Sequence, residues 1–223
     1  MREQYTQQLE AYYDSVVKLG NIVNEAVHKS IQAYNNNDKV LAEEIIKKDN
    51  EINDIVVEIE TEAYRLIALQ QPVTSDLRKV FTVLLASTDL ERIADHAAAI
   101  AKAVTRFSDE ETDVKAINEI LNNMFTVVEQ MLTDVVSSFT DKEIESAKLE
   151  SIALRDDEVD ALLKKLYGES SRRMKKNNEI VNYGIGHINI GTSLERIGDY
   201  TTNICERLIY LETGELVELN VKQ

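Results

Sequence analysis

The chain has 223 residues, with 40 acidic against 25 basic side chains and a formal charge of −15. That charge would repel the phosphate backbone of nucleic acid, so we do not expect nucleic-acid binding. No apolar run reaches the roughly 18 residues that a transmembrane helix needs, so no transmembrane segment is predicted. One Pro and seven Gly leave few turn-forming residues, a composition that favours long helices.

The N-terminus and the cysteine content both bear on location. Residues Met1–Gln4 begin without an apolar signal region, and the single Cys205 cannot form an internal disulfide. Both features are typical of a protein in a reducing compartment. We therefore expect a cytoplasmic protein.

Apolar residues recur every three or four positions along most of the chain, which predicts amphipathic helices. Turn signals at residues 35–38, at Pro72 and in the acidic segment 108–113 separate them. The expected helices are, in chain order, residues 9–34, 39–70, 74 to the break at 108, 117–135, 142–176 and a sixth that ends near Gly214. The sequence therefore predicts an all-α fold of six long helices.

An internal repeat divides these helices into two equal sets. The octapeptide at residues 88–95, Thr-Asp-Leu-Glu-Arg-Ile-Ala-Asp, returns 104 residues later as Thr-Ser-Leu-Glu-Arg-Ile-Gly-Asp, with six of eight positions identical. Upstream, residues 49–53 match residues 156–160 at a spacing of 107. Each half is therefore expected to be one structural unit.

We predict that each unit is a three-helix bundle and that the two bundles are arranged in tandem. The first bundle would comprise residues 1–108 and the second residues 109–223. Long helices joined by short connections favour elongated antiparallel bundles of this kind. A monomer of this shape would leave the N-terminal tyrosines Tyr5, Tyr12 and Tyr13 partly uncovered, which favours a homodimer, unless these residues lie inside the bundle, which the sequence equally allows.

Each octapeptide places two acids one helical turn apart. Glu91 and Asp95, and their counterparts Glu195 and Asp199, are four residues apart, so each pair shares one helix face, with carbons about 5 to 6 Å apart. The apolar residues of both helices cluster on the other face, which predicts that the acids point outward over a cleared surface. Two like charges at this spacing destabilise a helix by a few tenths of a kcal/mol, and the chain has this unfavourable pair in both repeats.

Two interpretations of these acids stay open from the residues alone. In the first, Arg92 and Arg196, or arginines of neighbouring helices, neutralise the carboxylates on an ordinary solvated surface. In the second, a cation binds; carboxylate ligands suit Mg, Mn, Ca or Fe, and one Cys excludes a closed Cys-rich zinc site. Extra ligands could then come from the second and fifth helices, at the corresponding pairs Asp49 and Asp156, Glu51 and Glu158, and Glu62 and Glu169.

Three segments resemble the signature of the PhoU family of phosphate-transport regulators. They are Asp89–His96, Ser193–Tyr200 and the connecting segment Pro72–Arg78. The resemblance covers about residues 9–212 and implies paired three-helix bundles that bind metal ions, with Fe, Mn, Mg or Zn as candidates. Carried over by position, the implied metal ligands are Glu91, Asp95, Glu195 and Asp199. Asp89 could join the first site.

The resemblance also implies a function through protein contacts. It implies a negative regulator that contacts the ATPase of the phosphate ABC importer and the phosphate sensor histidine kinase when phosphate is plentiful. The motifs place no extra acid or base beside an open metal position, so we do not expect an enzyme. The alternatives are an accessory protein of a simpler phosphate permease and, less favoured, a carboxylate-metal enzyme.

Overall fold

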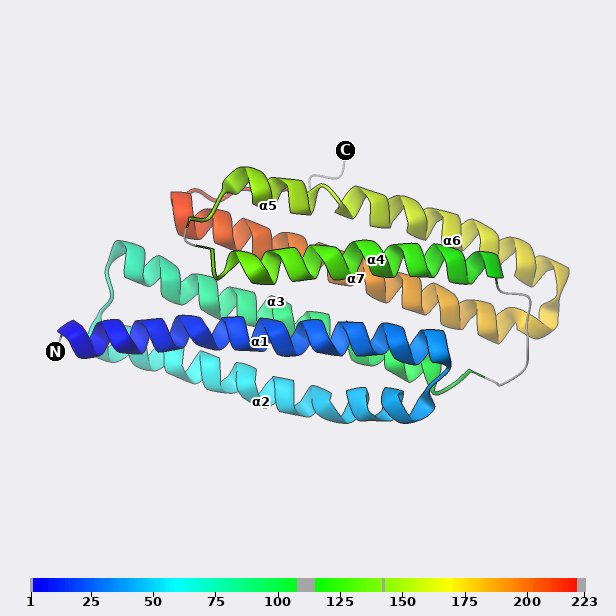
Figure 1. Cartoon of the computed structure of the whole chain (residues 1–223), viewed down its shortest axis with the longest axis horizontal. Helices are drawn as coiled ribbons and strands as arrows, with labels where there is room; N and C mark the ends of the chain where they lie inside the picture. Colours follow the sequence, from blue (N-terminus) through cyan, green and yellow to red (C-terminus); the bar gives the residue numbers. More distant parts are fainter. Residues whose placement is uncertain (1, 108–114, 142, 220–223) are drawn as a thin grey trace.

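The computed structural model describes residues 2–107, 115–141 and 143–219, and it is helical without strands over those ranges (Figure 1). The helices are α1 (Arg2–Asn36), α2 (Lys39–Gln70), α3 (Thr74–Val104), α4 (Lys115–Ser138), α5 (Ser146–Ala153), α6 (Asp156–Lys176) and α7 (Val181–Thr213), with a short 3-10 helix η1 (Asn178–Ile180) before α7. The predicted all-α fold of six long helices is confirmed, with the fifth divided into α5 and α6.

The break in the fifth helix has a local cause. At residue 155 the backbone amide bonds to the carbonyl of Ile152, three residues back, at 3.2 Å, which tightens the turn. The Arg155 side chain then pairs with Asp134 of α4 at 2.7 Å. The predicted start of this helix, residue 142, lies outside the described residues, and the helix begins at Ser146.

Turn chemistry separates α1, α2 and α3 where the sequence predicts it. The Asp38 side chain accepts a hydrogen bond from the amide of Leu41 at 3.0 Å and so caps α2, as expected for an acidic N-cap. Gln71, just before Pro72, ends α2 in the left-handed region with φ 49°. The acidic segment 108–113 and the boundary between residues 108 and 109 lie outside the described residues, so that boundary stays a prediction.

The predicted apolar faces form the core. In α3 the buried set includes Leu90, Ile93, Ala97 and Ile100, and in α7 it includes Leu194, Ile197, Ile204 and Leu208. Burying a side chain of this size stabilises the fold by about 1.5–3 kcal/mol, so these two faces hold the bundles together. Over the described ranges, none of the helices has the length and hydropathy needed to cross a bilayer.

Helices α3 and α7 lie side by side at the centre and run in opposite directions (Figure 1). Thr82 donates to the carbonyl of Arg207 at 3.4 Å, and His96 stacks on Tyr200 with ring centroids 5.9 Å apart. His96 and Tyr200 occupy the same position of the two repeats. The repeats therefore face each other about a pseudo-twofold axis near these rings.

The N-terminal tyrosines pack within the first bundle. Tyr12 is buried and its hydroxyl donates to the carbonyl of Val80 at 3.3 Å, while the Tyr5 hydroxyl donates to Asp76 at 3.1 Å. The ring of Tyr13 lies against Phe139 with centroids 6.0 Å apart. These contacts remove the uncovered tyrosines as an argument for a homodimer, and the homodimer itself stays a prediction.

Candidate functional site

The first acid pair lies on α3 beside α2. Burial, and then the charge of Asp95, raise the pKa of Glu91, and Asp49 of α2 raises it further. Burial and Asp95 likewise raise the pKa of Asp49. Asn53 follows Asp49 by four residues, on the same face of α2. Three carboxylates from two helices therefore repel one another at this position.

The first pair has no direct counter-charge in the part of the chain that the structure describes. Neither Glu91 nor Asp95 makes an ion pair or a hydrogen bond there, although the charge of Arg92 lowers the pKa of Glu91. The Oδ1 atoms of Asp49 and Asn53 are buried without a hydrogen-bond partner. Both oxygens are therefore available to accept a hydrogen bond or to contact a cation.

The second acid pair has the basic contact that the first lacks. Arg196 donates from Nη1 to Asp199 Oδ2 at 3.2 Å, and its Nε lies 3.5 Å from Glu195 Oε2. Glu195 is only 9% exposed. The interpretation in which arginine neutralises the acids therefore describes the second repeat and not the first.

A third acid approaches the second pair from α6. Asp156, the counterpart of Asp49, is 4% exposed and lies against Gly198. A Cβ added to Gly198 would come 2.3 Å from Asp156 Oδ1, so the missing side chain is what lets the carboxylate approach α7. In the first repeat Ala94 occupies the corresponding position.

The prediction of a cleared, outward acidic face is wrong. Asp95 is exposed, but Glu91 and Asp199 are half-buried. Ala98 and Thr202, which we expected to border an open surface, are both 1% exposed. The reason is that α3 and α7 are central helices, so the face opposite each helix's own core is covered in part by the other repeat.

Asp89 does not join the first pair. Asn203 of α7 donates to its Oδ1 at 3.4 Å, and Arg207 Nε lies 3.9 Å from its Oδ2. Burial raises the pKa of Asp89 to about 6, and the charge of Arg207 works against that rise. The sequence did not identify Asn203 and Arg207 as partners of Asp89. The repeat gives no signal for them, because their counterparts, Ala99 and Ala103, carry no polar group.

The connecting segment Pro72–Arg78 has a packing role in the structure. Asp76 accepts the hydrogen bond from Tyr5 of α1 described above. The Arg78 guanidinium lies against Gly214, where an added Cβ would be 2.0 Å from Nη1. Gly214 ends α7 with φ 78°, a left-handed conformation that glycine adopts without strain. The segment therefore ties the start of α3 to α1 and to the end of α7.

The donor chemistry of the first pair fits a hard cation, but the side chains are not gathered around one point. No group of three or more His, Cys, Asp or Glu side chains within the described ranges is arranged to hold a metal ion. The unpartnered oxygens of Asp49 and Asn53 beside two carboxylates are the ligand type that Mg, Mn or Ca prefers. Side-chain rotation at Glu91 and Asp95 would be needed to complete such a site.

Comparisons with known proteins agree over the length of the chain. The family model described as PhoU domain matches residues 16–104 and again residues 121–208. A protein of Clostridium acetobutylicum is 37% identical over 220 residues, covering 98% of this chain and 99% of that protein. One of Streptococcus pneumoniae is 40% identical over 220 residues, covering 99% and 100%. Both are named phosphate-specific transport system accessory protein PhoU homolog.

Solved structures give the same result. The crystal structure of the phosphate transport system regulatory protein PhoU from Streptococcus pneumoniae has a TM-score of 0.88 at 38% identity, covering 96% of this chain and 99% of that one. PhoU from Pseudomonas aeruginosa has a TM-score of 0.86 at 26% identity, covering 95% and 100%. The chain therefore belongs to the PhoU family, with one PhoU domain in each of its two helical repeats.

Proposed function

We propose that this chain is a non-enzymatic adaptor that restrains phosphate uptake and phosphate-responsive two-component signalling through protein contacts. The observation that carries the proposal is the full-length match, in sequence and in fold, to accessory and regulatory proteins of phosphate transport. The proposed partners are the ATPase of the phosphate ABC importer and the phosphate sensor histidine kinase, met in the cytoplasm. The relatives' names refer to the phosphate-specific transport system, which supports such an importer over a simpler permease.

We propose also that the first acid pair takes up a divalent metal ion or iron, with Fe, Mn, Mg and Zn as candidates. Glu91 and Asp95 of α3 would hold it together with Asp49 and Asn53 of α2. What supports this is the set of buried, unpartnered oxygens and the mutual repulsion of the three carboxylates. A bound cation would supply the positive charge that neutralises them.

The second pair, Glu195 and Asp199 with Asp156 nearby, is proposed as the weaker site. Arg196 already contacts both carboxylates, so a cation would have to displace a guanidinium before it could bind. The guanidinium is about half exposed while both carboxylates are mostly buried, so the need to displace it weakens a site without abolishing it. The two proposed sites are therefore unequal in affinity although their motifs are nearly identical.

A contact role is supported over catalysis by the surroundings of the first pair. His96, which follows Asp95 directly, stacks on Tyr200, and burial lowers the pKa of its ring. Its ring is thus held in the interface between the repeats and is not aimed at the carboxylates as a general base would need to be.

The test is phosphate uptake in a strain that lacks this protein, measured in scarce and in plentiful phosphate. We expect uptake to stay high in plentiful phosphate and to fall again when the wild-type gene is restored. Co-purification of the ATPase or the kinase with the wild-type protein should change with phosphate supply. Uptake that is the same with and without the protein, at every phosphate supply, would rule out the regulatory role.

A matched pair of variants separates the acid pairs from overall charge. The test variant replaces four acids with their amides: Glu91→Gln, Asp95→Asn, Glu195→Gln and Asp199→Asn. The control removes the same charge from exposed sites: Glu10→Gln, Glu43→Gln, Glu44→Gln and Glu150→Gln. We expect only the test variant to lose bound metal and the phosphate response. Equal behaviour of the two variants would contradict a functional role for the acid pairs.

A further inference from the structure

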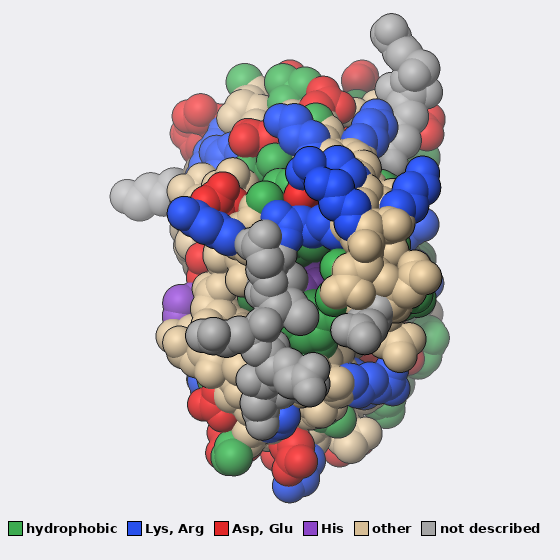
Figure 2. All heavy atoms as spheres, turned by 90° about the vertical axis from the view of Figure 1, so that its right-hand side faces the viewer, with side chains coloured by type: hydrophobic (Ala, Val, Ile, Leu, Met, Phe, Trp, Pro, Cys, Tyr) green, Lys and Arg blue, Asp and Glu red, His purple; other side chains and the backbone are tan. Residues whose placement is uncertain are grey.

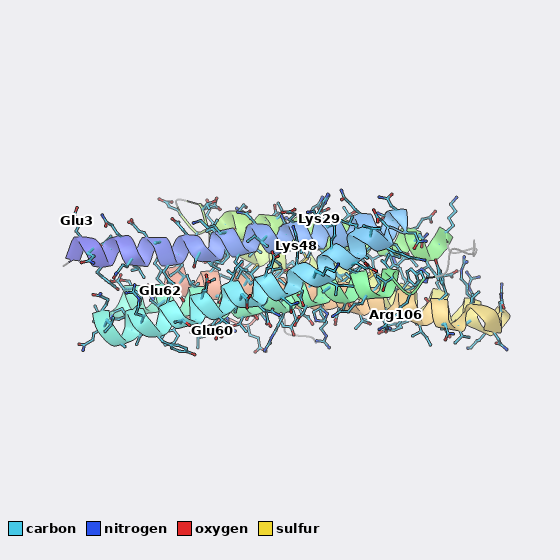
Figure 3. All side chains as sticks on the ribbon, turned by 90° about the horizontal axis from the view of Figure 1, so that it is seen from below. Glu3, Lys29, Lys48, Glu60, Glu62 and Arg106 are labelled. Atoms are coloured by element: carbon cyan, nitrogen blue, oxygen red, sulfur yellow. The ribbon has the colours of Figure 1, made fainter. Side chains whose placement is uncertain are left out.

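A cavity lies away from both acid pairs, at the end of the molecule where α3 stops and α7 starts (Figure 1). Its volume is about 430 Å³, within the range of small-molecule sites. The lining side chains that matter here are Arg106, Phe107, Asn182, Tyr183 and Asn189, together with Gly186. Figure 3 places Arg106 toward the opposite end of the molecule from Glu60 and Glu62 of α2.

One wall of the cavity is aromatic. The rings of Phe107 and Tyr183 have centroids 4.6 Å apart, and His187, 1% exposed, packs behind both at 5.1 and 4.6 Å. Gly186 makes room for this arrangement, because an added Cβ would be 2.6 Å from Phe107 Cε1. The wall is thus fixed by core packing, with Phe107 buried behind it, and the partly exposed ring of Tyr183 is the surface on which a flat ring can stack.

The other side of the cavity is polar and electropositive. The Arg106 guanidinium is exposed and forms no ion pair with any residue that the structure describes. It presents five N–H donors in a planar fork that matches the oxygens of a phosphate group. The amides of Asn182 and Asn189 both donate and accept hydrogen bonds, as the edge of a heterocyclic base requires.

Among the residues that the structure describes, basic side chains gather at the helix ends near the cavity. Although the chain carries −15, basic residues end the helices here, with Lys102 in the last turn of α3 and Arg173, Lys175 and Lys176 in the last turn of α6. Figure 2 shows Lys and Arg side chains gathered in the upper part of this end. A local positive field of this kind concentrates small anions at the cavity mouth.

We propose that this cavity binds a nucleotide, with the base against Tyr183 and Phe107 and the phosphate on Arg106. Inorganic phosphate could bind Arg106 but would not stack on the ring of Tyr183. An uncharged ring could stack there but would not bind the guanidinium. Base–aromatic stacking strengthens binding by about 5- to 150-fold, and a hydrogen bond to a charged group by about 10- to 150-fold. The site is separate from the first acid pair, because Arg106 follows Asp95 by a helix rise of roughly 16 Å.

The proposal can be tested by titration calorimetry of the full chain with AMP, adenosine and inorganic phosphate as separate probes. AMP should bind with one molecule per chain, and adenosine and phosphate each at least about tenfold more weakly. Arg106→Gln should lower the affinity for AMP by about 10- to 100-fold and leave the affinity for adenosine unchanged. Tyr183→Leu should lower the affinities for AMP and adenosine by about tenfold and leave the affinity for phosphate unchanged.

Arg172→Gln is the control, because it removes one exposed positive charge at the same end without lining the cavity. It should alter AMP binding less than about twofold. If Arg172→Gln and Arg106→Gln weaken AMP equally, the protein attracts anions only through its general field and the proposal is wrong. Absence of AMP binding at about 5 mM also overturns it. Arg106 is on the surface, so its variant tests the site even if Tyr183→Leu lowers the melting temperature.

Discussion

The two acid pairs have almost the same sequence and different surroundings. Arg92 and Arg196 hold the same position in the two octapeptides, yet Arg196 contacts both acids of its pair and Arg92 contacts neither. Arg92 instead lies over the ring of Tyr200, 5.5 Å from its centroid. The residue at the equivalent position facing Arg196 is His96, whose ring attracts a cation less than a phenol ring does.

In the two repeats, the residue across the pseudo-twofold axis differs, and with it the contacts of the motif arginine. Tyr200 holds one arginine away from the first acid pair, and His96 leaves the other arginine to bridge the second pair. The two arginines therefore have different surroundings, and Tyr200 and His96 are one of the side-chain differences between the repeats at this interface. The variants below change two positions at which the repeats differ, and then the arginine and the glutamate that the two octapeptides share.

The largest expected effect is at position 187, where the second repeat has a buried His and the first repeat has Val83. Burial lowers the pKa of His187 to about 4, below the ordinary value near 6.5. Between these values the unfolded chain binds the proton more readily, so the stability present above pH 6.5 is lost as the pH falls toward 4. The expected loss is about 3 kcal/mol in the free energy of unfolding.

His187→Leu should remove that part of the pH dependence, as judged by urea unfolding at pH 7, 5 and 4. A pH dependence in His187→Leu as steep as in the wild type would show that other groups cause it.

The next largest effect is expected at Gly198. The equivalent position of the first repeat is Ala94. Gly198→Ala should lower the free energy of unfolding by about 1–3 kcal/mol, because the new Cβ would overlap Asp156 Oδ1. Gly168→Ala is the matched control in α6, where nothing lies within 4 Å of an added Cβ. It should stabilise the protein by about 0.5–1 kcal/mol. Equal effects of the two changes in thermal unfolding would contradict the close approach of Asp156.

A smaller effect is expected from the bridging arginine. Arg196→Gln should raise the Mn²⁺ affinity of the second pair by up to about tenfold, since the cation no longer competes with a guanidinium. Arg92→Gln should change the Mn²⁺ affinity of the first pair by about threefold or less, because Arg92 lies over Tyr200 and not on the acids. Electron paramagnetic resonance of free Mn²⁺ during titration measures both. A larger effect from Arg92→Gln would reverse the proposed difference between the pairs.

The smallest expected effect is on the free energy of unfolding, which should change in opposite directions when the glutamate of each acid pair is replaced. Without metal, Glu91→Gln should stabilise the protein by a few tenths of a kcal/mol, because it removes repulsion from Asp95 and Asp49. Glu195→Gln should destabilise it by a similar amount, because it removes the contact with Arg196. Urea unfolding with a chelator present measures both. Stabilisation by both changes would mean that Arg196 does not neutralise the second pair.

Most of the fold could be predicted because its signals are local. The three-to-four-residue apolar period indicates each helix, and Pro72 and the Asn-rich turn before Asp38 indicate where helices end. The break between α5 and α6 was not predicted, because no Gly or Pro marks it. At the break, Arg155 also pairs with Asp134 of another helix, a contact that the sequence does not indicate.

The candidate sites were predictable only in part, for a similar reason. The octapeptides identify Glu91 and Glu195 as equivalent, but nothing in them distinguishes an open pair from a neutralised one. That difference arises from Tyr200 and His96 across the helix interface. The cavity at Arg106 left no sequence signal, because its residues come from two helix ends far apart in the chain and their counterparts in the other repeat differ.

The central claim is that the first pair is open to a cation and the second is neutralised by arginine. The most direct test is Mn²⁺ titration of the wild type, of Glu91→Gln/Asp95→Asn and of Glu195→Gln/Asp199→Asn, followed by electron paramagnetic resonance. We expect Glu91→Gln/Asp95→Asn to lose the tighter Mn²⁺ site and Glu195→Gln/Asp199→Asn to keep it. Loss of the tighter site in Glu195→Gln/Asp199→Asn, or unchanged Mn²⁺ binding in both variants, would contradict an open first pair.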